Sequence, residues 1–129
     1  MLNYLSVMLG GALGTGARYW ASGFIAHRSG EFFPLGTLLV NISGSFVIGF
    51  FATATDPQGR LFVSPGFRQF FMIGVLGGYT TFSSFNLQTL DLAQTGDWLK
   101  AGLNIFLSVA GCLLAVWAGR VLALVLLPK

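Results

Sequence analysis

Long apolar stretches, separated by short gaps that hold most of the charged residues, constrain the fold of this chain most strongly. A soluble domain carries about a quarter of charged residues, whereas here 9% of the residues are charged and 54% are hydrophobic. A hydrocarbon core needs about 20 apolar residues per helix, so four spans fit, over about residues 3–26, 34–55, 67–92 and 98–127. The apolar runs are continuous and do not alternate, which favours helices over a transmembrane barrel. We therefore predict an all-α membrane protein with a single domain, residues 1–129.

Small residues mark where the first and fourth stretches approach their neighbours. The first stretch lacks the basic start of a signal peptide and is too long for one, so we expect it to be retained as a span. Its Gly10 and Gly14 have the GxxxG spacing that lets helix backbones come close in lipid, and small residues from Gly111 to Gly119 repeat this spacing. Cys112 is the only cysteine, so an intrachain disulfide is excluded and a packing role is its simplest interpretation.

Basic residues are divided nearly evenly between the two ends of the expected bundle. An even number of spans puts both termini and the second gap on one side. Basic residues in the flanks of spans set orientation, so this near balance permits insertion in both orientations and hence an antiparallel homodimer. The net charge of +3 is too small and scattered to indicate nucleic-acid binding. The first side has Arg60, Arg68, Arg120 and Lys129, and the second has Arg18, Arg28 and Lys100.

Three of the four stretches carry neutral polar side chains at membrane depth, where each polar group needs a partner or water. No side chain among them is acidic, although a proton or cation pathway normally contains a buried carboxylate. Amide and hydroxyl hydrogens, together with the electropositive edges of aromatic rings, suit a small anion instead. Helical spacing groups them on three faces: Thr37, Asn41 and Ser45; Thr81, Ser84 and Gln88; Asn104, Ser108 and Cys112.

These residues also have structural interpretations, which the sequence leaves open. Hydroxyl groups in a span commonly bond to carbonyls of their own helix, and the spacing of Phe82 and Phe85 is typical of packing. Asn41 is harder to explain by packing, since a buried amide either joins helices or lines a pore. Arg18 lies late in the first stretch, where it either reaches the membrane surface by snorkelling or attracts anions in a vestibule.

Residues 77–81, GGYTT, interrupt the third stretch with poor helix formers. We predict a helix break there, near the middle of the membrane. A broken helix frees carbonyl groups that can hold a cation, and it exposes the positive end of the half-helix that follows. In an antiparallel dimer, two such breaks meet near the two-fold axis and can share one site.

The chain resembles the Fluc (CrcB) family of fluoride channels over essentially its whole length. The matching stretches are GGALGTGARYW in the first span, GTLLVNISGSFVIG at residues 36–49 and GVLGGYTTFSSF at residues 74–85. The second and third of these stretches, taken together, are highly specific to the family. The resemblance implies an antiparallel, dual-topology homodimer in the inner membrane of a prokaryote, with two fluoride pores and a structural sodium ion between the subunits.

The resemblance also implies roles for individual residues. It places the ring edges of Phe82 and Phe85 beside fluoride and the amide of Asn41 at the pore. This chain departs from the family pattern at Gln88, where family members often carry Glu, so the resemblance implies no carboxylate role at this position. The other implied pore residues are Ser108 in the fourth span, Thr37 in a vestibule, and Ser83 and Ser84 in a polar track beyond the rings, while the backbone carbonyls of Gly77 and Thr80 hold sodium.

The implied function is a passive, fluoride-selective leak of cytoplasmic fluoride out of the cell. No catalytic or nucleotide-binding motif occurs in the sequence, so we expect neither an enzyme nor an energy source. Two other classes stay open. A small drug-metabolite exporter would depend on a Glu in the first span, which this chain lacks. A membrane scaffold would tolerate Ala at Asn41, Phe82 and Phe85 with only a loss of stability.

Overall fold

The structure is a computed structural model that describes residues 1–30, 32–59 and 61–127. The described residues form helices and their connections, with no strand among them, so the all-helical fold class is confirmed. The helical segments begin and end close to the ranges expected from the sequence. In chain order they are α1 (Leu2–Ser29), α2 (Leu35–Ala54), α3 (Pro65–Gln69), η1 (Phe70–Leu76), α4 (Gly77–Tyr79), α5 (Phe82–Gln94) and α6 (Trp98–Leu126).

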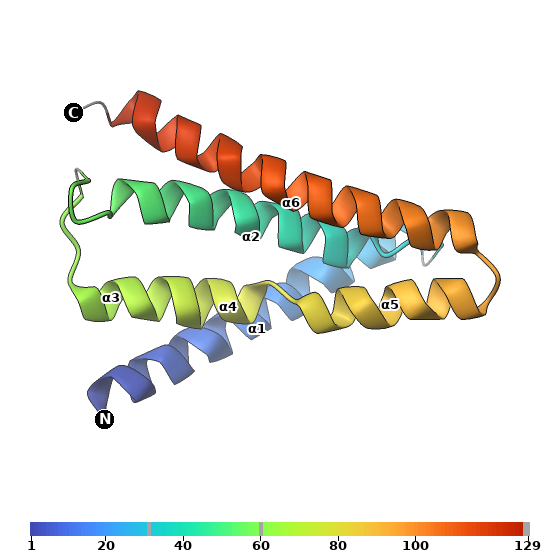
Figure 1. Ribbon diagram of the computed structural model, residues 1–129. Coiled ribbons are helices and arrows are strands. Elements are labelled where there is room, and N and C mark those ends of the chain that lie inside the picture. The colour runs from blue at the N-terminus through green and yellow to red at the C-terminus, as the bar shows by residue number, and fades with distance from the viewer. Residues whose placement is uncertain (31, 60, 128–129) are drawn as a thin grey trace.

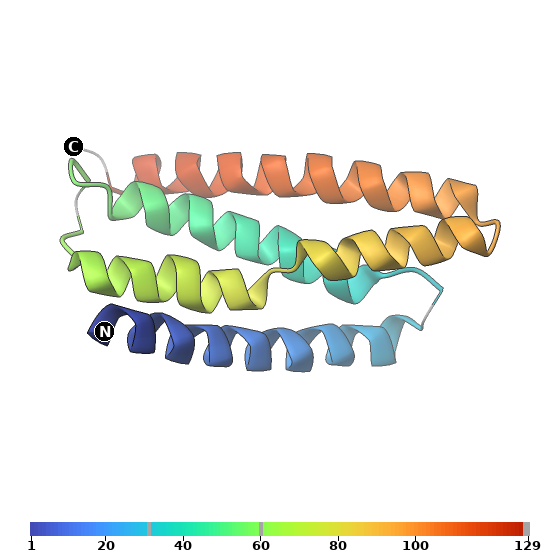
Figure 2. The ribbon, with the colours of Figure 1, turned by 60° about the horizontal axis from the view of Figure 1, so that its bottom comes forward.

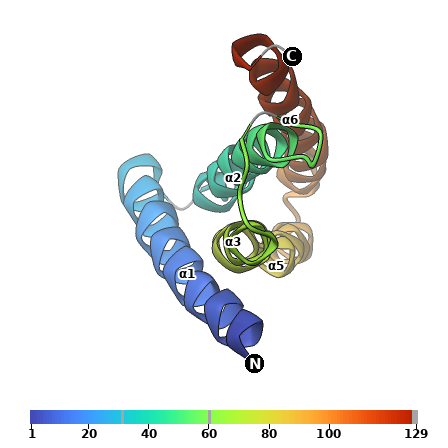
Figure 3. The same ribbon diagram turned by 90° about the vertical axis from the view of Figure 1, so that its left-hand side faces the viewer.

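Long rows of helix lie side by side and alternate in direction (Figures 1 and 2); in chain order they are α1, α2, the series from α3 to α5, and α6. The third row consists of α3, η1, α4 and α5 placed end to end, and we call it the composite helix. The start of α1, the end of α6 and the α2–α3 connection lie at one end of the bundle, as an even number of rows requires. The view along the bundle shows α2 between α1 and α6, with the composite helix below α2 and beside the first half of α1 (Figure 3).

Among the described residues, two helices, α2 and α6, are long and apolar enough to cross a membrane by length and composition alone. The 28 residues of α1 give it sufficient length but a lower hydropathy, and the composite helix is divided. Four membrane-spanning helices and an antiparallel pair of chains therefore stay predictions. Two basic residues used in the comparison of the two ends, Arg60 and Lys129, lie outside the described residues.

Glycines bring α1 close to the first half of the composite helix. A Cβ atom on Gly10 would lie 2.7 Å from the carbonyl oxygen of Phe70, and one on Gly14 would lie 2.8 Å from the amide nitrogen of Tyr79. Any side chain at these positions would push the two backbones apart. The GxxxG spacing in the sequence is thus confirmed as a close-packing seam, here between two helices of one chain.

A second seam of small residues joins α6 to α2. A Cβ atom on Gly119 would lie 2.9 Å from the amide nitrogen of Phe50 and closer still to the carbonyl oxygen of Phe46. One on Gly111 would lie 2.9 Å from the Cδ1 atom of Ile42. The spacing of small residues in the fourth stretch is therefore confirmed as the face that packs on α2.

The composite helix is broken at Thr80 and Thr81, whose backbones are extended, with φ and ψ of −82° and 155° and of −150° and 115°. The break is confirmed, but the expected role of the glycines needs correction, because Gly77 and Gly78 are helical. A Cβ atom on Gly78 would lie 2.5 Å from the carbonyl oxygen of Gly11, so Gly78 serves the contact with α1. Residues 70–76 also differ from the expected α-helix, since they form a π-helix along the same contact.

Replacing Gly119 by Val tests the α2–α6 seam. We expect Gly119→Val to lower the free energy of unfolding by about 1–3 kcal/mol, the usual effect of overpacking. Gly102→Val is the matched control, because a Cβ atom at this position of α6 meets nothing within 4 Å. The measurement is the midpoint temperature for loss of folded protein in detergent. An equal loss in both variants would contradict the proposed close packing.

Candidate functional site

The side chain of Asn41 from α2 binds the broken backbone of the composite helix. Its Nδ2 atom donates to the carbonyl oxygen of Thr81 at 2.9 Å, and its Oδ1 atom accepts from the amide nitrogen of Thr81 at 2.7 Å. The side-chain amide of Asn41 thereby satisfies both the backbone N–H and the backbone carbonyl of Thr81, as a neighbouring β-strand would. In a continuous α-helix the Thr81 amide would bond to the carbonyl of Gly77. Asn41 therefore stabilises the break in the composite helix, because it takes the place of this helical hydrogen bond.

Thr81 also caps the half-helix that follows the break. Its Oγ1 atom accepts from the amide nitrogen of Ser84 at 3.3 Å, donates to the hydroxyl oxygen of Ser84 at 3.1 Å and lies 3.3 Å from that of Ser83. Such a cap satisfies an amide that no helical carbonyl reaches. Three hydroxyl groups thus gather at the positive end of α5. Helical spacing puts Thr81 on a polar face but predicts no pore role for it, whereas the three-residue spacing of Thr81 and Ser84 is the sequence signal of a helix cap.

Phe82 and Phe85 form a pair at the start of α5. Their ring centroids lie 5.4 Å apart and their planes are inclined by 43°. The ring of Phe85 is buried, with 7% of the residue exposed, whereas Phe82 is 71% exposed in the single chain. One ring therefore belongs to the interior of the chain, and the other is available to lipid or to a second protein surface.

A cavity of about 410 Å³ lies between α2, the break and α6, and we call it the aromatic cavity. Both phenylalanines, Asn41, Ser108 and Cys112 are among its lining residues. Ser108 is 6% exposed, and its Oγ atom has no hydrogen-bond partner in the described part of the chain. An unpartnered buried polar group costs roughly 1–3 kcal/mol, and no described side chain offsets this cost for the Ser108 hydroxyl group.

A second cavity, of about 270 Å³, adjoins the first at Thr81, which lines both. We call it the polar cavity, since most of its lining side chains carry hydroxyl or amide groups. Arg18 of α1 is the one charged residue among the described residues that line it. The Oε1 atom of Gln88 is buried and without a partner in the described chain. The lining residues are Thr15, Arg18, Tyr19, Ser22, Thr37, Thr81, Ser84 and Gln88.

A third cavity, of about 470 Å³, shares Ser22, Thr37 and Gln88 with the polar cavity. We call it the outer cavity. The end of α1, the start of α2 and the last turns of α5 surround it, at the end of the bundle opposite the start of α1 (Figure 2). The shared residues place the three cavities in a row. The order is aromatic, polar and outer.

Most of the residues implied by the resemblance line one of these cavities, although their roles stay predictions. Gly77 and Thr80 border the aromatic cavity together with Asn41, Phe82, Phe85 and Ser108, the residues for which the resemblance implies a place in the pore. Ser83 is exposed and lines none of the three cavities. Asn104 lies on the same face of α6 as Ser108, but it does not line the aromatic cavity.

Asn104 joins two helices and does not face the cavities. It is 2% exposed, and its Nδ2 atom donates to the Oγ1 atom of Thr89 at 2.9 Å. This bond links α6 to α5. The polar face expected on the fourth stretch therefore divides into Asn104, which packs helices, and Ser108 with Cys112, which line the aromatic cavity.

The chain matches one family model and several curated relatives. The model describes the CrcB-like protein, Camphor Resistance (CrcB), and matches residues 5–120. A relative from Rhodospirillum rubrum is 61% identical over 120 residues, which cover 93% of each chain. One from Paramagnetospirillum magneticum is 57% identical over 126 residues, 98% of each chain. One from Methylocella silvestris is 55% identical over 122 residues, 95% of this chain and 93% of the relative.

All three relatives are named fluoride-specific ion channel FluC. The name describes a channel, not an enzyme, in agreement with the expectation from the sequence. An ion channel acts in a membrane, which agrees with the apolar α2 and α6. The extent of the family match and the identity of the relatives show that this chain is a membrane protein of the CrcB-like family.

Proposed function

We propose that this chain forms a passive, fluoride-selective channel through which cytoplasmic fluoride leaves a prokaryotic cell across its inner membrane. The observation that supports this most is the aromatic cavity, which Phe82 and Phe85 line together with Ser108, whose buried hydroxyl group has no partner in the described chain. The chain that contains it is 61% identical to a relative named a fluoride-specific channel.

Neutral groups suit the passage of a small anion through the aromatic cavity. The hydroxyl group of Ser108 can donate a hydrogen bond, and the Asn41 amide keeps one N–H beyond the one bound to Thr81. Ring edges of Phe82 and Phe85 add positive electrostatic potential without a formal charge. Conduction needs binding that is favourable yet weak, and a fixed cation at this point would hold the ion too firmly.

Thr81 connects the aromatic cavity to the polar cavity, where Ser84 and Thr37 continue the series of hydroxyl groups. Arg18 supplies a positive charge to this second cavity and would attract anions as part of a vestibule. No carboxylate lines either cavity among the described residues. Since coupling to protons or cations normally uses an intramembrane carboxylate, the arrangement supports passive conduction.

The functional unit that we propose is an antiparallel homodimer with dual topology and two pores. The 71% exposure of Phe82 in the single chain supports it, because a pore-lining ring needs a second wall. The near balance of basic residues between the two ends supports insertion in both orientations. A two-fold axis then gives each pore the same set of residues.

We further propose that a structural sodium ion lies between the two helix breaks and is not transported. Asn41 takes the Thr81 amide, which leaves the carbonyl of Gly77 without its usual helical partner. The extended backbone of Thr80 turns its carbonyl out of the helical direction. A hard cation binds such oxygen atoms, and two subunits together would supply four of them.

Two other functions receive less support. An exporter of the drug-metabolite type would need an intramembrane Glu in the first span, and α1 contains no acidic residue. A scaffold without transport gives no reason for the unpartnered Ser108 hydroxyl group in a cavity.

Fluoride efflux from proteoliposomes tests the proposed channel. We expect rapid fluoride efflux with the unmodified chain, no chloride efflux above background, and a fall of about tenfold in Phe82→Ile, equivalent to roughly 1.4 kcal/mol of lost aromatic interactions. Phe106→Ile is the matched control, because Phe106 is 66% exposed on α6 and lines none of the three cavities. Absence of fluoride efflux from the unmodified protein would refute the channel, and efflux unchanged in Phe82→Ile would refute the role of the ring.

Sodium dependence of thermal stability tests the cation site. We expect a higher midpoint temperature in sodium chloride than in N-methylglucamine chloride, and no such difference for Asn41→Leu, where the Thr81 amide can return to the Gly77 carbonyl. Thr80→Val keeps the backbone carbonyl and loses only the hydroxyl group that donates to Leu76, so the difference should persist. Equal stability of the unmodified chain in both salts would contradict the proposal.

A further inference from the structure

Charges of opposite sign lie on consecutive cavities of the proposed pathway. Arg18 is the charged residue of the polar cavity, and Asp91 of α5 is the one charged residue among the described residues that line the outer cavity. Ser22, Thr37 and Gln88 belong to both linings. An anion that moves between this end of the bundle and the aromatic cavity therefore passes Asp91 before it reaches Arg18.

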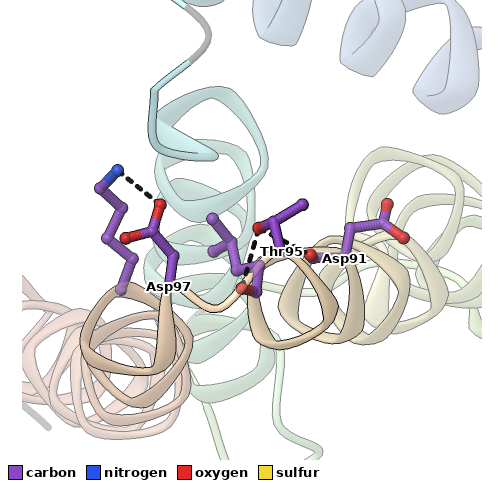
Figure 4. Close-up of polar contacts among 5 residues, drawn as sticks. Asp91, Thr95 and Asp97 are labelled. Atoms are coloured by element: carbon purple, nitrogen blue, oxygen red, sulfur yellow. Dashed lines mark hydrogen bonds and ion pairs between the residues drawn. The ribbon is translucent and has the colours of Figure 1, made fainter.

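The carboxylate of Asp91 is not neutralised within the described chain. The ion pair found there joins Asp97 to Lys100, with 2.9 Å between Oδ2 and Nζ. Figure 4 shows that the Asp91 carboxylate points away from this pair. The Thr95 hydroxyl group donates to the backbone carbonyls of Asp91, at 3.1 Å, and Leu92, at 3.0 Å, so it leaves the carboxylate untouched.

Asp91 and Asp97 thus form a natural comparison. Both are exposed, and both lie near the α5–α6 connection. Only Asp91 lines the outer cavity, and only Asp97 has a cationic partner. A negative charge that is both unpaired and next to the path of an anion lowers the local anion concentration, whereas a paired charge off the path does not.

We propose that Asp91, which is exposed and lines the outer cavity, limits the entry of fluoride and opposes the attraction by Arg18 deeper in the pathway. This inference rests on the proposed function as a fluoride channel. Because Asp91 is exposed, its field reaches an ion in the mouth mainly through water and is screened by salt. The expected effect on fluoride current is about twofold at low ionic strength.

Single-channel fluoride currents in bilayers of neutral lipid test the inference. The currents are compared at about 10 mM ionic strength and after addition of an impermeant salt to about 1 M, where the screening length falls from roughly 30 Å to 3 Å. We expect Asp91→Asn to carry about twice the current of the unmodified chain at low ionic strength and the same current at high ionic strength. Asp91→Glu, which keeps the charge, should match the unmodified chain under both conditions.

Asp97→Asn is the matched control and should leave the current unchanged at both ionic strengths. An unchanged or smaller current in Asp91→Asn at low salt would overturn the inference, and so would a gain that persists at high salt or also occurs in Asp91→Glu. These outcomes leave the channel itself standing. Absence of fluoride current from the unmodified chain would instead overturn the proposed function, and the inference with it.

Discussion

The two hydrogen bonds between the Asn41 amide and the Thr81 backbone are the interaction on which the candidate site depends. An extended residue inside an apolar bundle leaves two backbone groups that must be satisfied by protein. Asn41 satisfies both, and the consequences extend in two directions from the break. Before it, the Gly77 carbonyl is released from its helical bond. After it, Thr81 is free to cap α5 and to gather the hydroxyl groups of Ser83 and Ser84.

The close-packed seams hold Asn41 and Thr81 at the distance that these bonds need. Gly119 places α6 directly on the backbone of α2, which carries Asn41, and Gly78 places the composite helix on α1 just before the break. Both contacts are set by backbone atoms and leave little freedom to slide. The aromatic cavity is thus bounded by elements whose spacing is fixed by glycines, while its polar groups are fixed by the Asn41 bonds.

Much of this arrangement follows from the sequence because lipid imposes simple rules. Apolar length predicts the helical rows, and four-residue spacing of glycines predicts the seams. Propensity predicts a break but not its position, because Gly78 is retained in the helix by packing on Gly11, a tertiary contact. Helical spacing also groups Asn104 with Ser108 and cannot tell that Thr89 from another helix takes up the Asn104 amide. The π-helical winding of residues 70–76 has no mark in the sequence.

The three cavities differ both in the formal charges that line them and in how strongly water screens those charges. In the aromatic cavity, apolar walls leave fixed charges weakly screened, so a single cation would trap a small anion and a single carboxylate would exclude it. Neutral donors there provide attraction without either effect. Arg18 and Asp91 line the two cavities nearer the end of the bundle, and the exposed Asp91 is open to water and salt, which reduce its interaction with a passing ion. In the proposed channel, formal charges would therefore adjust the local supply of anions at the mouth, while selectivity would be left to the neutral groups around Phe82 and Phe85.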